Sequence, residues 1–163
     1  MWWRVLVVSV LLFIAGFGAH EVMHLLVIYA VGSQGEIIAR PWHLYFVDFS
    51  IWSVHAQPTQ QLDVARQSIV NFFGPFLAAI PFAVLLIYVR EPIALAALIA
   101  NVLILVFYAV IELLYVLLEA VWHTDAPLLV TPEFNYGVPL VIVILAAVTV
   151  TAVSALGGRR IPE

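Results

Sequence analysis

Two histidines and a glutamate lie in the middle of an apolar run, in the segment AGFGAHEVMHLLVIYA at residues 15–30. His20 and His24 are four positions apart, so on an α-helix their side chains point the same way and can bind a single Zn²⁺. Glu21 lies on the adjacent face, where it can accept a proton from water that the metal activates. Ionisable groups are costly in such surroundings, and a bound metal offsets that cost for the histidines. This HExxH pattern predicts one Zn²⁺ per chain.

The composition places this motif in an integral membrane protein. Hydrophobic residues make up 65% of the 163 residues and charged residues 10%, whereas a soluble domain is about half apolar and a quarter charged. The absence of cysteine excludes disulfides, thiolate metal ligands and thiol catalysis. The net charge of −4 is thinly spread and all six basic residues are arginine, so the sequence contains no basic patch that would indicate a nucleic-acid partner.

Four segments can cross a bilayer, whose hydrocarbon core requires about 20 apolar residues per helix. They are residues 3–31, 69–89, 92–121 and 136–156. The expected fold is an all-α polytopic membrane protein, with residues 1–163 forming a single domain. With four such spans, four arginines fall on the side of the two termini and two on the other, so the positive-inside rule predicts cytoplasmic termini. The sequence leaves the oligomeric state open, a homo-oligomer included.

The connection between the first two spans, residues 32–68, has a pattern of its own. Its middle, WHLYFVDFSIWSVHA, is aromatic and β-branched and contains neither Gly nor Pro. Such a composition predicts strands, arranged as a short membrane-associated β-hairpin. An amphiphilic loop on the membrane surface is the alternative that the same residues allow.

A catalytic zinc site takes three protein ligands and leaves a fourth position for water. One helical face of the third span carries Asn101, Glu112, Glu119 and His123. A polar stripe on an apolar span faces the interior of a helix bundle. Counted along its span, Glu112 lies about 30 Å from the start, level with His20 and His24, and Glu119 lies about 10 Å further. Glu112 is therefore the predicted third ligand, with Glu119 and Asp125 as alternates; a protonated Glu112 bonded to a tyrosine is the other state considered.

These residues together resemble the site-two protease family of intramembrane zinc metalloproteases, over about residues 10–125. The HExxH motif in an early span is the first similarity. The second is SIVNFFGPFLAA, in which Gly74 and Pro75 occupy the glycine-proline motif that the family carries in the next helix, packed near the site. The strand-like connection is the third, because strands of this family line the active-site entrance and can pair with an extended substrate.

The chain departs from the family pattern at three places. Met23 precedes the second histidine where members often have Gly, and Ala78 stands where the family has Asn. The leucine-aspartate-glycine motif that supplies the family's third ligand is missing, so Glu112 takes that role in our interpretation. No regulatory domain accompanies the membrane segments, which leaves a chain close to a bare catalytic core.

The resulting prediction is a zinc metalloendopeptidase that hydrolyses peptide bonds of transmembrane protein or peptide substrates, within or beside the bilayer. The expected metal ligands are His20, His24 and Glu112. Glu21 is the expected catalytic base, and Asn71 and Asn101 are candidate donors to the oxyanion or to the substrate backbone. Two alternatives stay open: a non-proteolytic membrane protein that binds metal or helices, and a metal-dependent lipid hydrolase.

Overall fold

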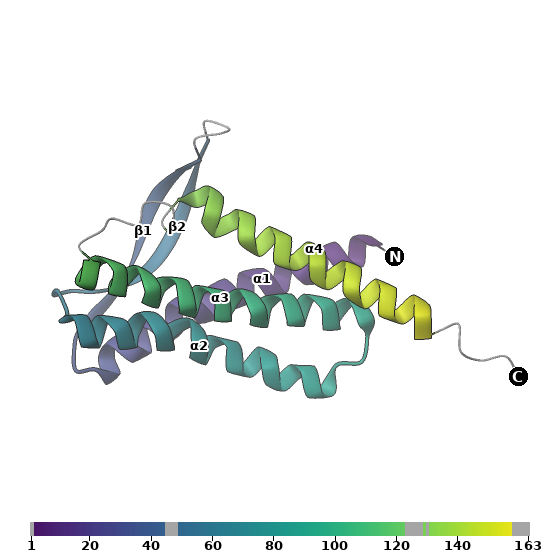
Figure 1. Ribbon diagram of the computed structural model, residues 1–163, viewed down its shortest axis with the longest axis horizontal. Coiled ribbons are helices and arrows are strands. Elements are labelled where there is room, and N and C mark those ends of the chain that lie inside the picture. Colours follow the sequence, from purple (N-terminus) through teal and green to yellow (C-terminus); the bar gives the residue numbers. More distant parts are fainter. Residues whose placement is uncertain (1, 45–48, 123–128, 130, 158–163) are drawn as a thin grey trace, which may run out of the picture.

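The computed structural model describes residues 2–44, 49–122, 129 and 131–157 (Figure 1). In these ranges the chain forms four helices and a two-stranded sheet: α1 (Trp2–Ala30), β1 (Gly35–Leu44), β2 (Phe49–Pro58), α2 (Val64–Tyr88), α3 (Pro92–Trp122) and α4 (Pro132–Gly157). Each helix contains a stretch that is long and apolar enough to cross a membrane. The expected all-α, multi-pass membrane fold with a β-hairpin between the first two helices is confirmed.

The start of α2 differs from the sequence prediction, since the helix begins at Val64 rather than at residue 69. Its N-cap is Asp63, whose Oδ1 atom accepts a hydrogen bond from the Arg66 backbone N–H at 2.9 Å. A capping carboxylate fixes where a helix begins independently of hydropathy. The polar first turn is therefore helical although it is not part of the apolar span.

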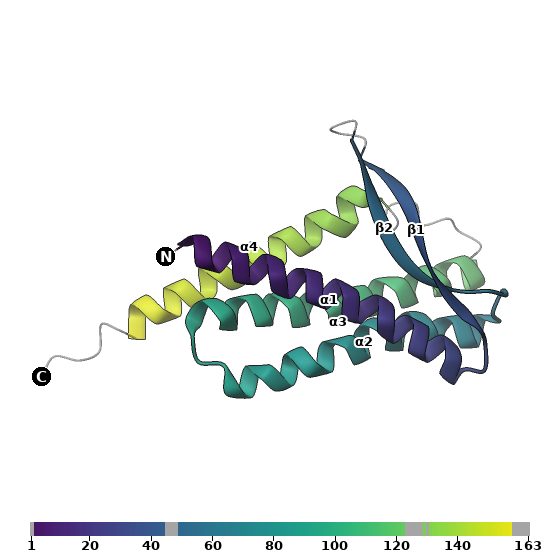
Figure 2. The same cartoon turned by 180° about the vertical axis from the view of Figure 1, so that it is seen from behind.

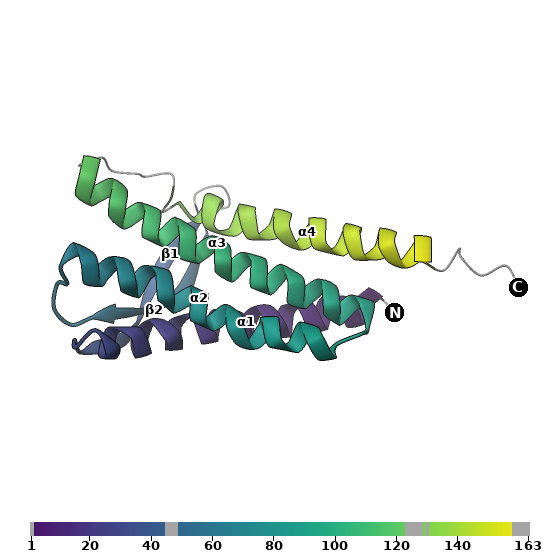
Figure 3. The same ribbon diagram turned by 60° about the horizontal axis from the view of Figure 1, so that its bottom comes forward.

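The four helices run alongside one another, and the hairpin projects from one end of the bundle (Figures 1 and 2). The N-terminus of α1, the connection between α2 and α3, and the C-terminus of α4 lie at the opposite end. Figure 3 shows α3 between α2 and α4, with α1 packed against α2 and α3. Helix α4 contacts mainly α3, and only 6% of its spanning segment is buried within the chain, which leaves most of its apolar surface for lipid.

Small residues allow the helices to pack closely at the bundle centre. A side chain at Gly16 of α1 would place its Cβ 2.6 Å from the Asn101 Oδ1 atom of α3, so a larger residue at this crossing would require the Asn101 side chain to shift. Ala78 and Ala79 of α2 pack with Leu98 of α3 in the buried core. Between membrane helices, close van der Waals packing of small residues is a main source of association. These contacts fix α1, α2 and α3 as one unit.

The register of the hairpin determines which backbone groups face outward. Strands β1 and β2 pair antiparallel, with Pro41 opposite Trp52 and Pro58 opposite Gly35. Beyond the strand ends the Thr59 N–H donates to the Gln34 carbonyl at 2.9 Å, which identifies that pair as hydrogen-bonded. Since hydrogen-bonded and non-hydrogen-bonded pairs alternate, both prolines fall at positions where no N–H is needed between the strands.

The two faces of the hairpin differ in polarity. Side chains that point away from the helices are apolar and exposed, as at Trp52 (74% exposed) and Ile37 (49%). The described side chains at the alternate positions are polar except for Ile38: Ser53 is buried, and Arg40 and His55 line a cavity described below. The apolar face thus points outward and the polar face inward, the reverse of a hairpin on a soluble protein. This arrangement suits a hairpin in contact with the bilayer.

The orientation of the bundle can be measured with single cysteines, because the chain has no native cysteine. Gln60 is exposed on the hairpin side, and Glu91 is exposed in the connection at the end that holds the termini. From the arginine distribution we expect Gln60→Cys to react with an impermeant thiol reagent only from outside, and Glu91→Cys only from the cytoplasm. The reverse labelling pattern would show that the orientation inferred from the arginine distribution is wrong for this chain.

Candidate metal centre

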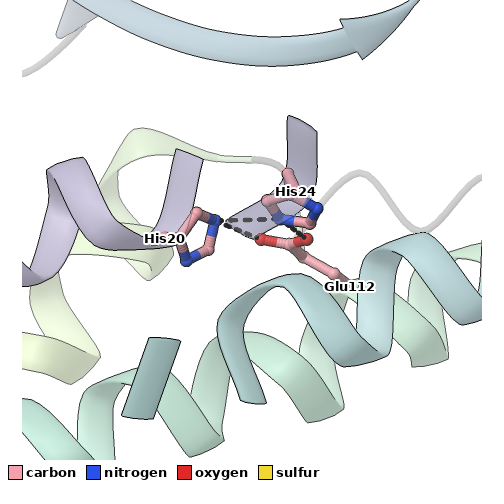
Figure 4. A group of neighbouring side chains, drawn as sticks. All are labelled: His20, His24 and Glu112. Carbon is pink, nitrogen blue, oxygen red and sulfur yellow. Dashed lines mark hydrogen bonds and ion pairs between the residues drawn. The ribbon is translucent and has the colours of Figure 1, made fainter. Parts of the chain in front are cut away.

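His20, His24 and Glu112 point toward one another inside the bundle (Figure 4). The Nε2 atoms of the two histidines are 3.1 Å apart, Glu112 Oε1 is 3.1 Å from His20 Nε2, and Glu112 Oε2 is 3.0 Å from His24 Nε2. Ligand atoms about 2.1 Å from a tetrahedral ion are about 3.4 Å from one another. The three side chains are thus spaced closely enough to share one ion, and their two nitrogens and one oxygen are donors that zinc accepts.

The helical geometry of α1 presents both histidines to the same point. His20 and His24 lie on successive turns and each is only 6% exposed. The ring of Tyr108 from α3 packs edge-on against His20, with the ring centroids 5.4 Å apart. This contact holds the His20 imidazole in place from the α3 side.

Gly74 of α2 makes room for the second histidine. A Cβ atom at this position would lie 2.6 Å from His24 Cγ and 2.7 Å from His24 Cε1, closer than carbon atoms approach one another. The glycine-proline segment therefore packs directly against a metal-ligand candidate. Both Gly74 and Pro75 are buried, so α2 forms one wall of the site.

Glu112 reaches the histidines from α3, and Glu119 does not. Glu119 lines a neighbouring cavity between α2 and α3, with Gln61 and Gln67. The depth estimate from the sequence thus selected the residue that the structure brings to the site. Both carboxylate oxygens of Glu112 contact the histidines, and the Tyr108 hydroxyl donates to the Asn135 carbonyl at 2.8 Å. Asp125, the other alternate, lies outside the described residues.

Glu21 lies beside the three ligands without joining them. Its Oε1 atom is 3.8 Å from His20 Nε2, and its Oε2 atom accepts a hydrogen bond from the Ala56 backbone N–H at 2.6 Å. The hairpin register explains why this N–H is available, since Ala56 belongs to a pair that is not hydrogen-bonded across the strands. Strand β2 therefore anchors one oxygen of the Glu21 carboxylate and leaves the other next to the ligand group.

A cavity of about 490 Å³ connects the ligand group to the polar face of the hairpin. Residues of α1, both strands, α2, α3 and α4 contribute to its walls. Asn71 is among them: its Nδ2 atom donates to the Glu112 backbone carbonyl at 3.3 Å, and its Oδ1 atom accepts from Gln67 Nε2 at 2.6 Å. Asn71 thus lies in the wall of the cavity beside Glu112.

Asn101, the other amide singled out from the sequence, lies elsewhere. It is buried near Gly16, and its Nδ2 atom donates to the Ala97 carbonyl of its own helix at 2.9 Å. Asn101 is not among the residues that line the cavity. It shares the helical face of Glu112, but 11 residues of helix separate the two by about 16 Å.

The sequence did not reveal the contribution of the hairpin backbone. Nothing in the residue type of Ala56 indicates that its amide contacts Glu21, because the contact depends on strand register. A weaker signal was present for the side chains, since Ser53, His55 and Gln57 alternate with apolar residues. That alternation indicates a polar strand face, which the structure turns toward the cavity.

Two buried polar atoms at the site, His20 Nδ1 and Ser53 Oγ, form no hydrogen bond within the part of the chain that the structure describes. Both residues line a smaller cavity of about 80 Å³, together with Tyr108 and Asn135. A histidine that ligates a metal through one nitrogen usually donates its other N–H to a carboxylate, a carbonyl or water. His20 Nδ1 has no such partner among the described residues, and the adjacent cavity of about 80 Å³ has room for a water molecule to take that role.

Comparison with known proteins gave no match: no protein-family model matches the chain, and no curated protein or solved structure does. The functional argument therefore depends on the geometry of the site.

The first prediction for the site compares two glutamates on one helix. Glu112→Gln removes the anionic ligand with little change in volume, so zinc affinity should fall by at least the roughly 10- to 100-fold typical of outer contacts to a metal site. Glu119→Gln, one cavity away, should keep wild-type affinity. Zinc titration of the two purified variants measures this. Metal loss in Glu119→Gln rather than in Glu112→Gln would show that the ligand assignment is wrong.

The second prediction concerns the fit of Gly74 against His24. Gly74→Ala should displace the His24 ring and lower the zinc content of the purified protein, because the added methyl group has no space. Gly18→Ala is the matched control on α1, since a Cβ there meets nothing within 4 Å. It should retain zinc and be neutral or slightly stabilising, as alanine is favoured over glycine in helices by about 0.5–1 kcal/mol. Equal zinc content in both variants would contradict this packing.

Proposed function

We propose that this chain is an intramembrane zinc metalloprotease of the site-two protease type, which cleaves transmembrane protein or peptide substrates. The observation that carries the proposal is the joint position of His20, His24 and Glu112, with the Glu21 carboxylate beside them. Three ligands with an open fourth position are typical of catalytic rather than structural zinc sites. Ionisable groups within membrane spans are rare and generally functional, which supports the same interpretation.

The proposed chemistry divides between the metal and the chain. A zinc ion held by His20, His24 and Glu112 would supply Lewis acidity to water and to a peptide carbonyl at this site. Glu21 accepts the proton of the attacking water and afterwards gives it to the leaving amine. The Ala56 N–H holds Glu21 Oε2 at 2.6 Å, so the carboxylate does not need to reorient for either step. Asn71 is the proposed donor to the substrate backbone, and Asn101 has no part because it lies away from the cavity.

A substrate must be extended to be cut, because helical carbonyl groups are already hydrogen-bonded. The free edge of β2 is the proposed docking strand. Ala56 directs its N–H away from β1, and the alternation of the ladder gives Val54 and Trp52 the same direction. The opposite edge is less suitable, because Pro41 of β1 has no N–H to offer. A peptide strand added to β2 would run past Glu21.

The strand edge also bears on the alternative functions. A lipid hydrolase could use the same three ligands and base, but it has no use for a strand edge whose N–H groups at Val54 and Trp52 point away from β1 near the base. A protein that only binds metal or helices needs no carboxylate beside the metal. The peptide-hydrolase proposal uses all of these features, which is why we favour it.

The test is Glu21→Gln, assayed for zinc content and for cleavage of fluorogenic transmembrane peptides in proteoliposomes. Loss of the general base should reduce the cleavage rate by about 10²- to 10⁴-fold, while zinc stays bound because Glu21 is not a ligand. Glu119→Gln is the matched control and should cleave at the wild-type rate.

Three results would contradict the proposal. Undiminished cleavage by Glu21→Gln would remove Glu21 from the chemistry. A wild-type protein that holds zinc and cleaves no peptide would indicate a binding protein. Hydrolysis of phospholipid esters in place of peptides would assign the site to the lipid alternative.

A further inference from the structure

Arg40 brings a positive charge into the cavity of the candidate metal centre. It lies on the polar face of β1 and lines the cavity together with His20, Glu21 and Glu112. Its Nη2 atom donates to Gln57 Oε1 at 2.9 Å, and Gln57 Nε2 in turn donates to Glu36 Oε1 at 3.0 Å. The amide of Gln57 therefore orients the guanidinium group from the side of β2.

Arg40 forms no direct ion pair with a carboxylate among the described residues. Arg66, in contrast, pairs with Asp63, with Nε and Oδ2 3.4 Å apart. Among the described residues that line the cavity, Arg40 is the only arginine or lysine.

The charge count of the loaded site points to an anionic ligand. The carboxylates of Glu21 and Glu112 together balance the two positive charges of a bound zinc ion. With the histidines neutral, Arg40 leaves the cavity with one net positive charge. Guanidinium groups bind carboxylates with paired, planar hydrogen bonds, and such charge-assisted bonds are stronger than bonds between neutral groups. A substrate that carries a carboxylate into this cavity would be favoured.

We propose that Arg40 selects substrates with an acidic side chain close to the scissile bond. The inference rests on the proposed protease function and names the substrate class of that site. Arg40 pairs with Ser53, which is three residues, or about 10 Å, along β2 from the Ala56 amide that holds Glu21. The Arg40 side chain extends toward Gln57 and so shortens this distance. The acidic residue should therefore lie within about three residues of the bond that is cut.

A peptide carboxylate suits this position better than a lipid phosphate. Arg40 is on the inward face of the hairpin, whereas the outward face carries Trp52, Val54 and Ile37. The apolar outward face suits contact with lipid, whereas the guanidinium lies on the opposite, polar face of the hairpin. A substrate strand on β2 directs alternate side chains to the inward face, where Arg40 lies.

The test uses pairs of fluorogenic peptides that differ only by Glu or Gln at one of the three positions on either side of the scissile bond. At one position the wild-type protein should cleave the Glu peptide with a kcat/KM about 10-fold or more above that of the Gln peptide, as expected for a charge-assisted hydrogen bond. Arg40→Gln should bring this ratio close to unity. Arg40→Glu should reverse the preference toward a peptide with Arg at that position. Arg66→Gln, which lies outside the cavity, is the matched control and should keep the wild-type ratio.

The failure of this inference is distinguishable from failure of the protease proposal. If the wild-type protein cleaves both members of every pair equally well, the role of Arg40 is wrong and the protease proposal is unaffected. The same conclusion follows if the wild-type protein prefers the Glu peptide and Arg40→Gln keeps that preference. If no peptide is cleaved, the same pairs are measured for binding to Glu21→Gln by fluorescence anisotropy. Equal affinity for both members then overturns the inference, and tighter binding of the Glu peptide that Arg40→Gln abolishes supports it. The inference would also be overturned if the effect of Arg40→Gln depended on anionic phospholipid in the vesicles and not on the acidic residue of the peptide.

Discussion

The convergence of two imidazoles and a carboxylate at about 3 Å, inside a bundle built to sit in lipid, is the constraint on which the rest of the structure depends. Uncompensated, such groups would destabilise a membrane fold. Their meeting requires α1 and α3 to lie at a fixed depth and distance from one another. Gly16 sets the close approach of α1 to α3, and Gly74 lets α2 pack on the His24 ring. The small residues of the core are thus part of the site's geometry.

The hairpin contributes backbone and side-chain groups that the helices do not supply to the candidate site. By itself the bundle brings together the three candidate ligands and the Glu21 carboxylate, but β2 supplies the N–H group that anchors Glu21. The same strand edge offers further outward N–H groups, and its polar face closes the cavity with His55 and Arg40. Its apolar face turns outward, as at Trp52. The hairpin therefore has three roles in this account. Its apolar face suits contact with lipid, its backbone supports the proposed base, and its free edge is the proposed docking site for the substrate.

Much of this architecture could be predicted from the sequence, for identifiable physical reasons. The spans follow from the minimum length of a helix in lipid, and the HExxH spacing from the period of the α-helix. Glu112 could be selected over Glu119 because the start of α1 and the start of α3 lie at the same end of the bundle, so that residue counts convert to comparable depths. The strand prediction held because aromatic and β-branched residues concentrate between the first two spans.

Other features depend on tertiary structure and could not be derived in this way. The first turn of α2 is set by the Asp63 cap and not by hydropathy. Asn101 lies on the same helical face as Glu112 but at the level of Gly16 in the bundle. The position on a helical face alone does not distinguish a residue that packs between helices from one that lines the cavity. The contact between Ala56 and Glu21 follows from the hairpin's register, which only the fold fixes. Residue type carries no trace of such backbone contacts.

The central claim is that His20, His24 and Glu112 together bind one zinc ion, and X-ray absorption at the zinc edge of the purified protein tests it most directly. The account predicts stoichiometric zinc with a first shell of four nitrogen and oxygen atoms at about 2.0–2.2 Å, two of them showing the outer-shell scattering of imidazole rings. A protein that remains free of zinc after reconstitution with the metal, or a spectrum with fewer than two imidazole ligands, would contradict it.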